Sequence, residues 1–196
     1  MSCAHNKEIQ SLNNGDILFR GNQQRGLSQA INKVTQTTRE TNYTHMGICK
    51  LANDSVYIIH ASSKNGVCME PLMDFCRPNN DTLYITDVYR LKTELNVNIN
   101  SALTNAINLI GQPYDDTYIM ERPGYYCSEF IYYIFKSDSV FTLNPMTFID
   151  PATGNFHTDW VEHYQKLGVN IPEGMPGCNP NGMAAEGKLD FITRIQ

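Results

Sequence analysis

The sequence predicts an α+β fold in one domain that spans residues 1–196. Three observations lead to this prediction. The chain passes from a short helix through a run of strands with antiparallel turns to further helices, an order typical of α+β proteins. It contains no repeat and no linker-like segment, and 41% of its residues are hydrophobic, which is enough for a substantial core.

The first elements are predicted from turn residues and from helical spacing. The turn Asn-Asn-Gly-Asp over residues 13–16 precedes a short apolar stretch at 17–19, which predicts a buried strand. Within residues 26–34 the apolar side chains have the spacing of one helix face, so a short amphipathic helix is expected. The polar segment 35–42 that follows is predicted to be a loop.

Two strands joined by a tight turn are predicted next. Residues 45–51 and 56–61 both alternate between two faces, and the Asn-Asp pair between them favours a tight turn, so we expect a hairpin. His45 begins the first of these strands and His60 lies near the end of the second.

Further elements complete the better-patterned part of the chain. Residues 67–70 and 83–91 are expected to be a third and a fourth strand of this series. A helix over about 101–110 ends at Gly111, and residues 112–116 form a turn.

The last third of the chain has weaker patterns. We expect a short helix at about 159–167, an irregular loop rich in Gly, Pro and Asn over 172–187, and a last strand over 191–195. The chain therefore divides into a core at about 13–137 and a C-terminal extension, 138–196, whose structure the pattern does not define.

Composition excludes some classes of partner. The formal net charge of −5, from 15 basic and 20 acidic residues, argues against non-specific binding to nucleic acid or to an anionic membrane surface, which a basic patch would favour. No apolar run reaches the roughly 18 residues that a membrane-spanning helix needs. The six cysteines are widely spaced and form no C-x-x-C pair, so we expect mostly free thiols.

Cys127 stands where a turn becomes an apolar helix. Pro123 and Gly124 interrupt the preceding segment, and apolar residues recur with helical spacing from Phe130 to Phe135. Unpaired backbone N–H groups and the helix dipole at a helix start favour a thiolate, which is the attacking form of cysteine. The alternative is a small hydrophobic side chain in the core, since free cysteines are often buried.

A nucleophilic cysteine needs a base, and His45 and His60 are the strongest candidates among five histidines. Neighbouring strands lie about 4.8 Å apart, so the two side chains can meet across the predicted hairpin. A hydrogen-bonded structural histidine would explain either one alone. Two histidines on adjacent strands, beside a helix-start cysteine, favour a catalytic site.

No metal site and no cofactor are predicted. The nearest candidates for metal ligands are His157 and His163, six residues apart, with Cys178 loosely placed after them. This arrangement lacks the spacing of zinc ligands.

Five short motifs follow one another along the chain. They are Gly15-Asp-Ile-Leu-Phe19, Tyr43-Thr-His-Met-Gly47, Val56-Tyr-Ile-Ile-His-Ala61, Gly111-Gln-Pro-Tyr-Asp115 and Tyr125-Tyr-Cys-Ser-Glu129. Taken in order, they resemble those of the YiiX-like proteins, which belong to the papain-like NlpC superfamily of cysteine hydrolases, in the circularly permuted branch that also contains lecithin–retinol acyltransferase-like enzymes. The order of histidine first and cysteine last fits the permutation, and the resemblance covers about residues 13–137.

The resemblance implies a circularly permuted papain-like fold, in which an antiparallel sheet packs against a small helical bundle. Cys127 would be the nucleophile, His45 the general base and later the acid, and His60 the residue that orients His45. The YiiX-like pattern tends to carry glutamate at the place of His60, and histidine is more similar to the acyltransferase branch. A second imidazole can accept a hydrogen bond from His45, but it gives less electrostatic support than a carboxylate.

Residues of the same motifs are candidates for substrate binding. Tyr126, just before the nucleophile, could line the cleft or help to stabilise an oxyanion, for which the backbone N–H of Cys127 is a further donor. Tyr43 shares the motif of His45. Asp115 could attract a cationic group of a substrate, although an aspartate that forms a turn is the commoner case.

The expected chemistry is acyl transfer through a cysteine thioester. The first expectation is a cysteine amidohydrolase or peptidase acting on cell-wall peptide amides, since the wider superfamily largely cleaves such bonds. The second is an acyltransferase or hydrolase acting on lipid acyl groups, which His60 and the aromatic residues around Tyr126 leave open. The third is a non-catalytic binding module on the same fold, against which the intact Cys127 and His45 argue.

The N-terminal residues lead to two expectations about location. They carry no positively charged and apolar segments of a signal peptide. Ser2-Cys3 followed by a polar stretch resembles the residues around a bacterial lipoprotein cleavage site, which favours a cell-envelope or periplasmic lipoprotein tethered to the membrane through a lipidated Cys3. The alternative is a cytoplasmic protein with an ordinary N-terminus.

Overall fold

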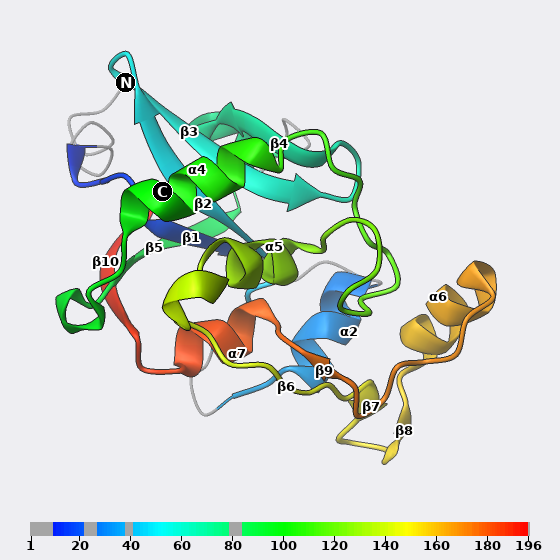
Figure 1. The fold of residues 1–196 in the computed structure, drawn as a ribbon. Helices are drawn as coiled ribbons and strands as arrows, with labels where there is room; N and C mark the ends of the chain where they lie inside the picture. The colour runs from blue at the N-terminus through cyan, green and yellow to red at the C-terminus, as the bar shows by residue number, and fades with distance from the viewer. Residues whose placement is uncertain (1–9, 22–26, 38–40, 79–83, 196) are drawn as a thin grey trace.

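The computed structural model describes residues 10–21, 27–37, 41–78 and 84–195. The prediction about Cys3 lies outside these ranges. The fold is α+β, as predicted, and it is built on one six-stranded antiparallel sheet (Figure 1). Within the described ranges, no helix combines the length and the apolar character that crossing a membrane requires.

Each strand of this sheet overlaps a segment that the sequence predicted to be a strand. Across the sheet their order is β10-β5-β1-β2-β3-β4, so the last strand of the chain pairs with β5 rather than with its predecessors in sequence. In chain order the strands are β1 (Ile17–Gly21), β2 (His45–Ala52), β3 (Ser55–Ser62), β4 (Gly66–Pro71), β5 (Ile85–Leu91) and β10 (Leu189–Ile195).

The part of the chain that the structure describes contains six α-helices with defined bounds, of which four were expected from the sequence and two were not. The expected helices are α2 (Leu27–Val34), α4 (Ile99–Asn108), α5 (Cys127–Ile134) and α6 (Thr158–Leu167). The unexpected helices are α3 (Leu72–Cys76) and α7 (Pro180–Ala185). The short pairs β6 (Asn144–Pro145) with β9 (Pro176–Gly177) and β7 (Ile149–Asp150) with β8 (Asn155–Phe156) complete the fold, with 3₁₀ turns at Thr93–Leu95 and Lys136–Asp138.

The helix α7 corrects the prediction of an irregular loop over residues 172–187. Asn179 caps the helix, because its side chain accepts the N–H of Gly182, and Pro180 occupies the first turn, where a missing N–H costs nothing. Met183 and Ala184 are buried in the main core. Gly and Pro therefore mark the ends of a short helix here, and packing against the core stabilises it.

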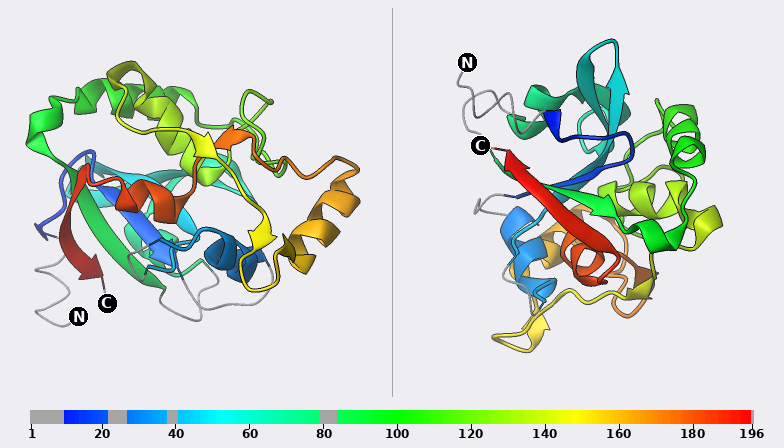
Figure 2. Two further views of the ribbon diagram at one scale, coloured as in Figure 1. Left: turned by 90° about the horizontal axis from the view of Figure 1, so that it is seen from below. Right: turned by 90° about the vertical axis from the view of Figure 1, so that its left-hand side faces the viewer.

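The alternation along β2 and β3 separates two cores. One face of the sheet packs against α4, α5 and α7, and the other face against α3. The first core includes Met46, Ile48 and Ile59, whereas the second includes Cys49 and Ile58. A third cluster joins α2 to α6, which lies at the end of the molecule opposite β10 (Figure 2).

The hairpin between β2 and β3 forms as predicted, with Asn53 and Asp54 at φ values of 48° and 59° in its turn. Gly47 lets the two strands approach closely. A Cβ atom at this position would lie 2.5 Å from the Cγ2 of Ile58 and 3.0 Å from the Cβ of His60. A larger residue would therefore displace the strand that carries His60.

Asp16 joins the first turn to the sheet through an ion pair whose carboxylate is buried. Its carboxylate accepts two hydrogen bonds from Arg90, at 2.7 and 2.9 Å, and one from the N–H of Asn13 at 2.7 Å. The aspartate is fully buried, whereas the Arg90 side chain is partly exposed. The pair therefore anchors the chain at the point where it enters the central strand β1.

We expect Asp16→Ala to lower the free energy of unfolding by about 2–4 kcal/mol, because it leaves a guanidinium and a backbone N–H without their buried partner. Urea unfolding followed by circular dichroism measures this change. Asp190→Ala is the control, since Asp190 is exposed on β10 and should change stability by less than about 0.5 kcal/mol. Equal unfolding midpoints for Asp16→Ala and the parent would contradict a stabilising role of the pair.

Candidate active site

The helix α5 places Cys127 at its first residue, as predicted. Gly124, with a φ of 98°, turns the chain before the helix, and the carboxylate of Glu129 accepts the N–H of Tyr126 at 3.3 Å. The apolar face of α5 then packs on β2 and β3. Cys127 is thus held at a rigid helix start and is only 5% exposed.

Burial determines the resting protonation of Cys127. It raises the pKa of the thiol to about 11, although hydrogen bonds from the backbone N–H groups of Ser128, Met46 and Cys127 itself, and the charge of Arg20, act in the opposite direction. The helix-start amides therefore have the effect that the sequence suggested, but they do not outweigh desolvation. The expectation of a resting thiolate is corrected to a neutral thiol.

We expect alkylation of Cys127 by iodoacetamide to be slow at neutral pH and to rise about tenfold for each pH unit towards a pKa of about 11, because only the thiolate reacts. Peptide mapping after short exposures between about pH 6 and pH 10 measures the rate at this one cysteine. In the urea-unfolded protein the same rate should level off near pH 8.5, the ordinary thiol pKa. A rate already at its plateau at pH 6 would mean that a thiolate is formed in the free protein.

The structure brings His45 and His60 into direct contact. The Nε2 atom of His45 lies 2.7 Å from the Nδ1 atom of His60, and the two rings meet edge to face. Phe75 of α3 packs against both rings. Burial, followed by the charges of Arg20 and His60, holds the pKa of the His45 imidazole well below its ordinary value. His45 is therefore a neutral base.

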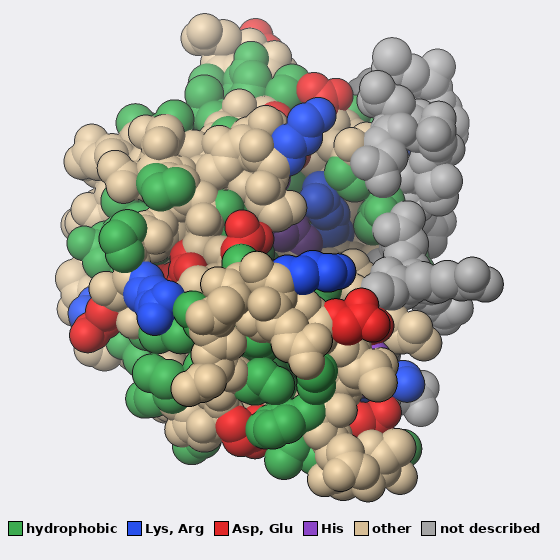
Figure 3. Space-filling view, turned by 90° about the vertical axis from the view of Figure 1, so that its right-hand side faces the viewer, with side chains coloured by type: hydrophobic (Ala, Val, Ile, Leu, Met, Phe, Trp, Pro, Cys, Tyr) green, Lys and Arg blue, Asp and Glu red, His purple; other side chains and the backbone are tan. Residues whose placement is uncertain are grey.

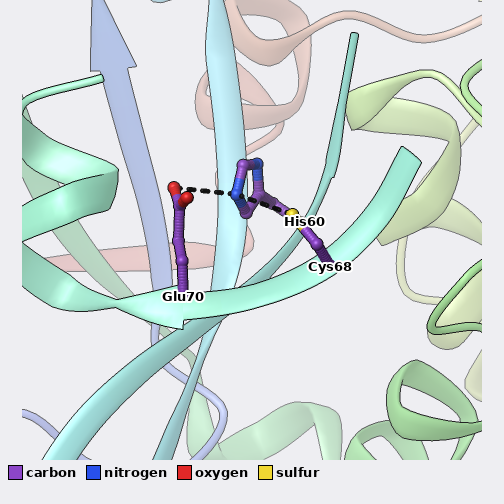
Figure 4. Close-up of side chains that lie close together, drawn as sticks. All are labelled: His60, Cys68 and Glu70. Atoms are coloured by element: carbon purple, nitrogen blue, oxygen red, sulfur yellow. Dashed lines mark hydrogen bonds and ion pairs between the residues drawn. The ribbon is translucent and has the colours of Figure 1, made fainter. Parts of the chain in front are cut away.

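A carboxylate on the neighbouring strand contacts the other side of the His60 ring. Glu70 of β4 places its Oε1 atom 2.9 Å from the Nε2 atom of His60, as Figure 4 shows. Burial would raise the pKa of the Glu70 carboxyl, but the hydrogen bond from His60 and the charges of His60 and Arg20 outweigh it, so the net shift is downwards. The ionised carboxylate is an acceptor, which assigns a proton to Nε2 of His60.

This hydrogen-bond pattern fixes the role of each nitrogen in the series. Because His60 donates from Nε2 to Glu70, its Nδ1 atom accepts a hydrogen bond from the Nε2–H of His45. The Nδ1 atom of His45 is then left with a free lone pair. The arrangement thus presents one basic nitrogen, oriented by a second imidazole and a carboxylate.

Glu70 is the residue that the sequence analysis missed. It lies in the predicted third strand of the hairpin series, and alternation places it on the same face as Cys68. Strands β3 and β4 are in the register that pairs His60 with Cys68, so the face of β4 that carries Cys68 and Glu70 lies beside the His60 imidazole. This register depends on where the turn after β3 falls. The available signal was a charged residue on the inward face of a strand beside one that carries histidine.

Cys127 and the histidine pair approach the same end of β2. The backbone N–H of Met46, the residue that follows His45, lies close enough to Cys127 to lower the pKa of its thiol. The first residue of β2 is His45 itself, and Thr44 before it lines a cavity that Cys127 also lines. Cys127 and His45 therefore both lie near this end of β2.

A cavity of about 320 Å³ opens beside Cys127. Its walls combine aromatic and aliphatic side chains with several threonines, two asparagines and Glu186, and among the described residues that line it none is lysine or arginine. Much of the wall comes from the extension after residue 137. The apolar side chains that line it include Tyr114, Tyr118, Phe148, Trp160, Met146 and Met183.

Figure 3 shows one hollowed face of the molecule, where a histidine lies at the floor between side chains of both charges.

The three residues considered for substrate binding lie in different surroundings. Tyr126 lines the cavity, but its hydroxyl donates to the sulfur of Met120 and accepts the N–H of Cys178. Tyr43 is buried in the core, where its hydroxyl donates to Asp87, and it is not among the residues that line the cavity. The tyrosine hydroxyls are thus engaged by the fold itself.

Asp115 also has protein partners for its carboxylate. It accepts hydrogen bonds from the N–H and the hydroxyl of Thr117 and from the N–H of Ile119. These contacts shape the loop before α5, and Asp115 does not line the cavity. The structure therefore corresponds to the turn-forming alternative for this residue.

Comparison with known proteins gives matches of two kinds. A family model described as permuted papain-like amidase enzyme, YaeF/YiiX, C92 family, matches residues 11–193. The crystal structure of metalloprotein yiiX from Escherichia coli O157:H7 superposes with a TM-score of 0.73, covering 94% of this chain and 98% of that chain at 20% sequence identity. The second match concerns the fold alone. Comparison with curated proteins gives no match.

Proposed function

The chain belongs to this family of permuted papain-like amidases and is a papain-like cysteine hydrolase, and from that premise we propose that it cleaves amide bonds of cell-wall peptides through a thioester on Cys127. The observation that carries the mechanism is the hydrogen-bonded series of Glu70, His60 and His45. His45 begins β2, and the next residue of that strand, Met46, lies beside Cys127.

The first half of the reaction forms the thioester. The Cys127 thiol gives its proton to Nδ1 of His45 as the sulfur attacks the carbonyl carbon. The backbone N–H groups of Met46 and Ser128, which lower the pKa of the thiol, would serve as donors to the developing oxyanion. The C–N bond then breaks, and His45 returns the proton to the leaving amine.

The second half of the reaction releases the product. A water molecule attacks the thioester carbonyl while His45 takes one of its protons. The C–S bond breaks, the carboxylic acid leaves, and the Cys127 sulfur regains its proton from His45. The proton balance at His45 is zero over the cycle, so the same neutral imidazole starts the next turnover.

His60 and Glu70 act as positioning residues in this mechanism. When His45 becomes an imidazolium, its Nε2–H donates to His60, and the charge is stabilised by the Glu70 carboxylate through the intervening ring. The Glu70 carboxylate therefore supports the base, even though the residue that contacts His45 directly is a histidine. The weaker support expected from His60 alone is compensated by the next strand.

The cavity favours a second candidate for the substrate. Its lining of aromatic rings and methionines is suited to an acyl chain or another apolar group, and it offers no described basic side chain to a carboxylate of a peptide. An acyltransferase or hydrolase acting on lipid acyl groups would use the same thioester. The substrate class, rather than the nucleophile, is what separates the two candidates.

Mass spectrometry of products distinguishes them. The protein is incubated separately with muropeptides and with acylated lipids in water enriched in ¹⁸O. We expect a new amine and an ¹⁸O-labelled carboxylic acid from the muropeptides, and a transient acyl adduct on Cys127. Turnover of acylated lipids alone would favour the second candidate. If neither mixture changes and no adduct forms, both hydrolytic proposals are refuted for these substrates.

A further inference from the structure

His60, Cys68 and Glu70 form a compact cluster of ligand-type atoms beside the active site. The Nε2, Sγ and carboxylate oxygen atoms all lie within 4.8 Å of one another. Figure 4 shows the three side chains pointing at one another from β3 and β4. Cys68 is the cross-strand partner of His60, and Glu70 follows it by two residues on the same face. The cluster therefore rests on rigid strand positions.

The spacing of these atoms fits a zinc ion. Nε2 of His60 lies 2.9 Å from the Glu70 carboxylate and 3.5 Å from the Cys68 sulfur. Tetrahedral zinc with bonds of about 2.0–2.3 Å separates its ligand atoms by about 3.3–3.8 Å. The Cys68 sulfur and the Glu70 carboxylate oxygen lie within 4.8 Å of each other, so no separation has to change by more than about 1 Å. One imidazole, one thiolate and one carboxylate also leave a fourth position for water.

The chemistry of the ligands selects the kind of metal. A thiolate excludes Mg²⁺ and Ca²⁺ as natural occupants and favours Zn²⁺ and related ions. The nearby cation is Arg20, whose guanidinium donates to the carbonyl of Phe75 and lies over its ring. Zn²⁺ together with a thiolate and a carboxylate has no net charge, so Arg20 would face no excess positive charge.

We infer that Zn²⁺ binds at His60, Cys68 and Glu70 and that it turns the general base off. Bound through Nε2, the neutral ring of His60 must carry its proton on Nδ1. It then donates to Nε2 of His45 instead of accepting from it. His45 consequently carries its own proton on Nδ1, the nitrogen that should accept the proton of Cys127. The inhibitory part of this inference rests on the proposed function, whereas the metal site does not.

The protons balance in this change of state. Each imidazole has one proton before and after binding. The proton of His45 Nε2 passes to Nδ1 of His60, and His45 Nδ1 gains, through solvent, the proton that leaves Nε2 of His60. The Cys68 thiol releases its proton to solvent on binding. No bond to carbon changes, so removing the metal restores the base.

Metal binding is tested without any substrate. The full-length protein is treated with EDTA, dialysed and titrated with Co²⁺, which gives a thiolate-to-metal absorption band, and with Zn²⁺ in a calorimeter. We expect one equivalent to bind, with a band that persists in Cys127→Ala and is lost in Cys68→Ser, together with at least about a 100-fold loss of Zn²⁺ affinity in Cys68→Ser. A band that is absent from the parent, or that disappears in Cys127→Ala, would overturn the inference.

The switch has two further readouts. Histidine ¹⁵N NMR should show His45 protonated on Nε2 without metal and on Nδ1 with Zn²⁺, and an unchanged tautomer would refute the switch even in an inactive protein. In the hydrolysis assay Zn²⁺ should inhibit the parent reversibly, while Cys68→Ser keeps its basal rate and escapes inhibition. Equal inhibition of both proteins would point to direct binding at Cys127 and would also refute the switch.

Discussion

Cys127→Ala is expected to lower kcat for amide hydrolysis by at least about 10⁴-fold, because the alanine variant has no atom that can form the thioester. The residual rate should be that of substrate held beside water by the cavity and the backbone amides. No acyl adduct should appear on the protein by mass spectrometry. Substrate affinity should change little, since the thiol is a small part of the cavity wall.

Cys178→Ala is the matched control for this experiment. Cys178 is also buried and lines the same cavity, but its sulfur lies 3.9 Å from the hydroxyl of Tyr126, and it sits outside the start of α5. This variant should retain most of the parent activity. Both variants should unfold in urea close to the parent, which separates a chemical effect from a folding defect. Hydrolysis by Cys127→Ala at the parent rate would exclude the covalent mechanism.

The sequence predicts those features that depend on local patterns. Alternation and the Asn-Asp turn were sufficient to place the hairpin and so to bring His45 near His60. Pro123 and Gly124 before an apolar run were sufficient to place the start of α5 at Cys127. The other strands of the sheet were likewise predicted from local signals, such as the turn residues before the apolar stretch at 17–19.

Features that depend on tertiary packing were not predictable in this way. Whether Glu70 reaches His60 is decided by the register of two strands, and a shift of one residue would turn it away. The protonation of Cys127 is decided by how completely other elements bury it. The cavity is built largely by residues after 137, where single-segment patterns are weak and the short helix α7 is stabilised by the core.

A graded series of variants tests the support of the base. His45→Ala should lower kcat by at least about 10³-fold, since it removes the proton acceptor. His60→Ala should lower kcat by about 10²-fold, and Glu70→Gln by about tenfold, because the amide oxygen can still accept from His60 but has no charge. KM should stay nearly constant throughout, since these residues act on the transition state rather than on substrate binding.

A rescue variant separates positioning from structural support. In the double variant His60→Glu with Glu70→Gln, a carboxylate would accept directly from the Nε2–H of His45, and the Gln side chain avoids two adjacent negative charges. We expect kcat to recover to within about tenfold of the parent, whereas His60→Ala with Glu70→Gln should stay low. A merely structural role of His60 predicts no such recovery, because glutamate cannot replace the packing of the imidazole against Phe75. Recovery by the carboxylate would therefore show that the base requires an oriented acceptor at this position, whichever strand supplies its charge.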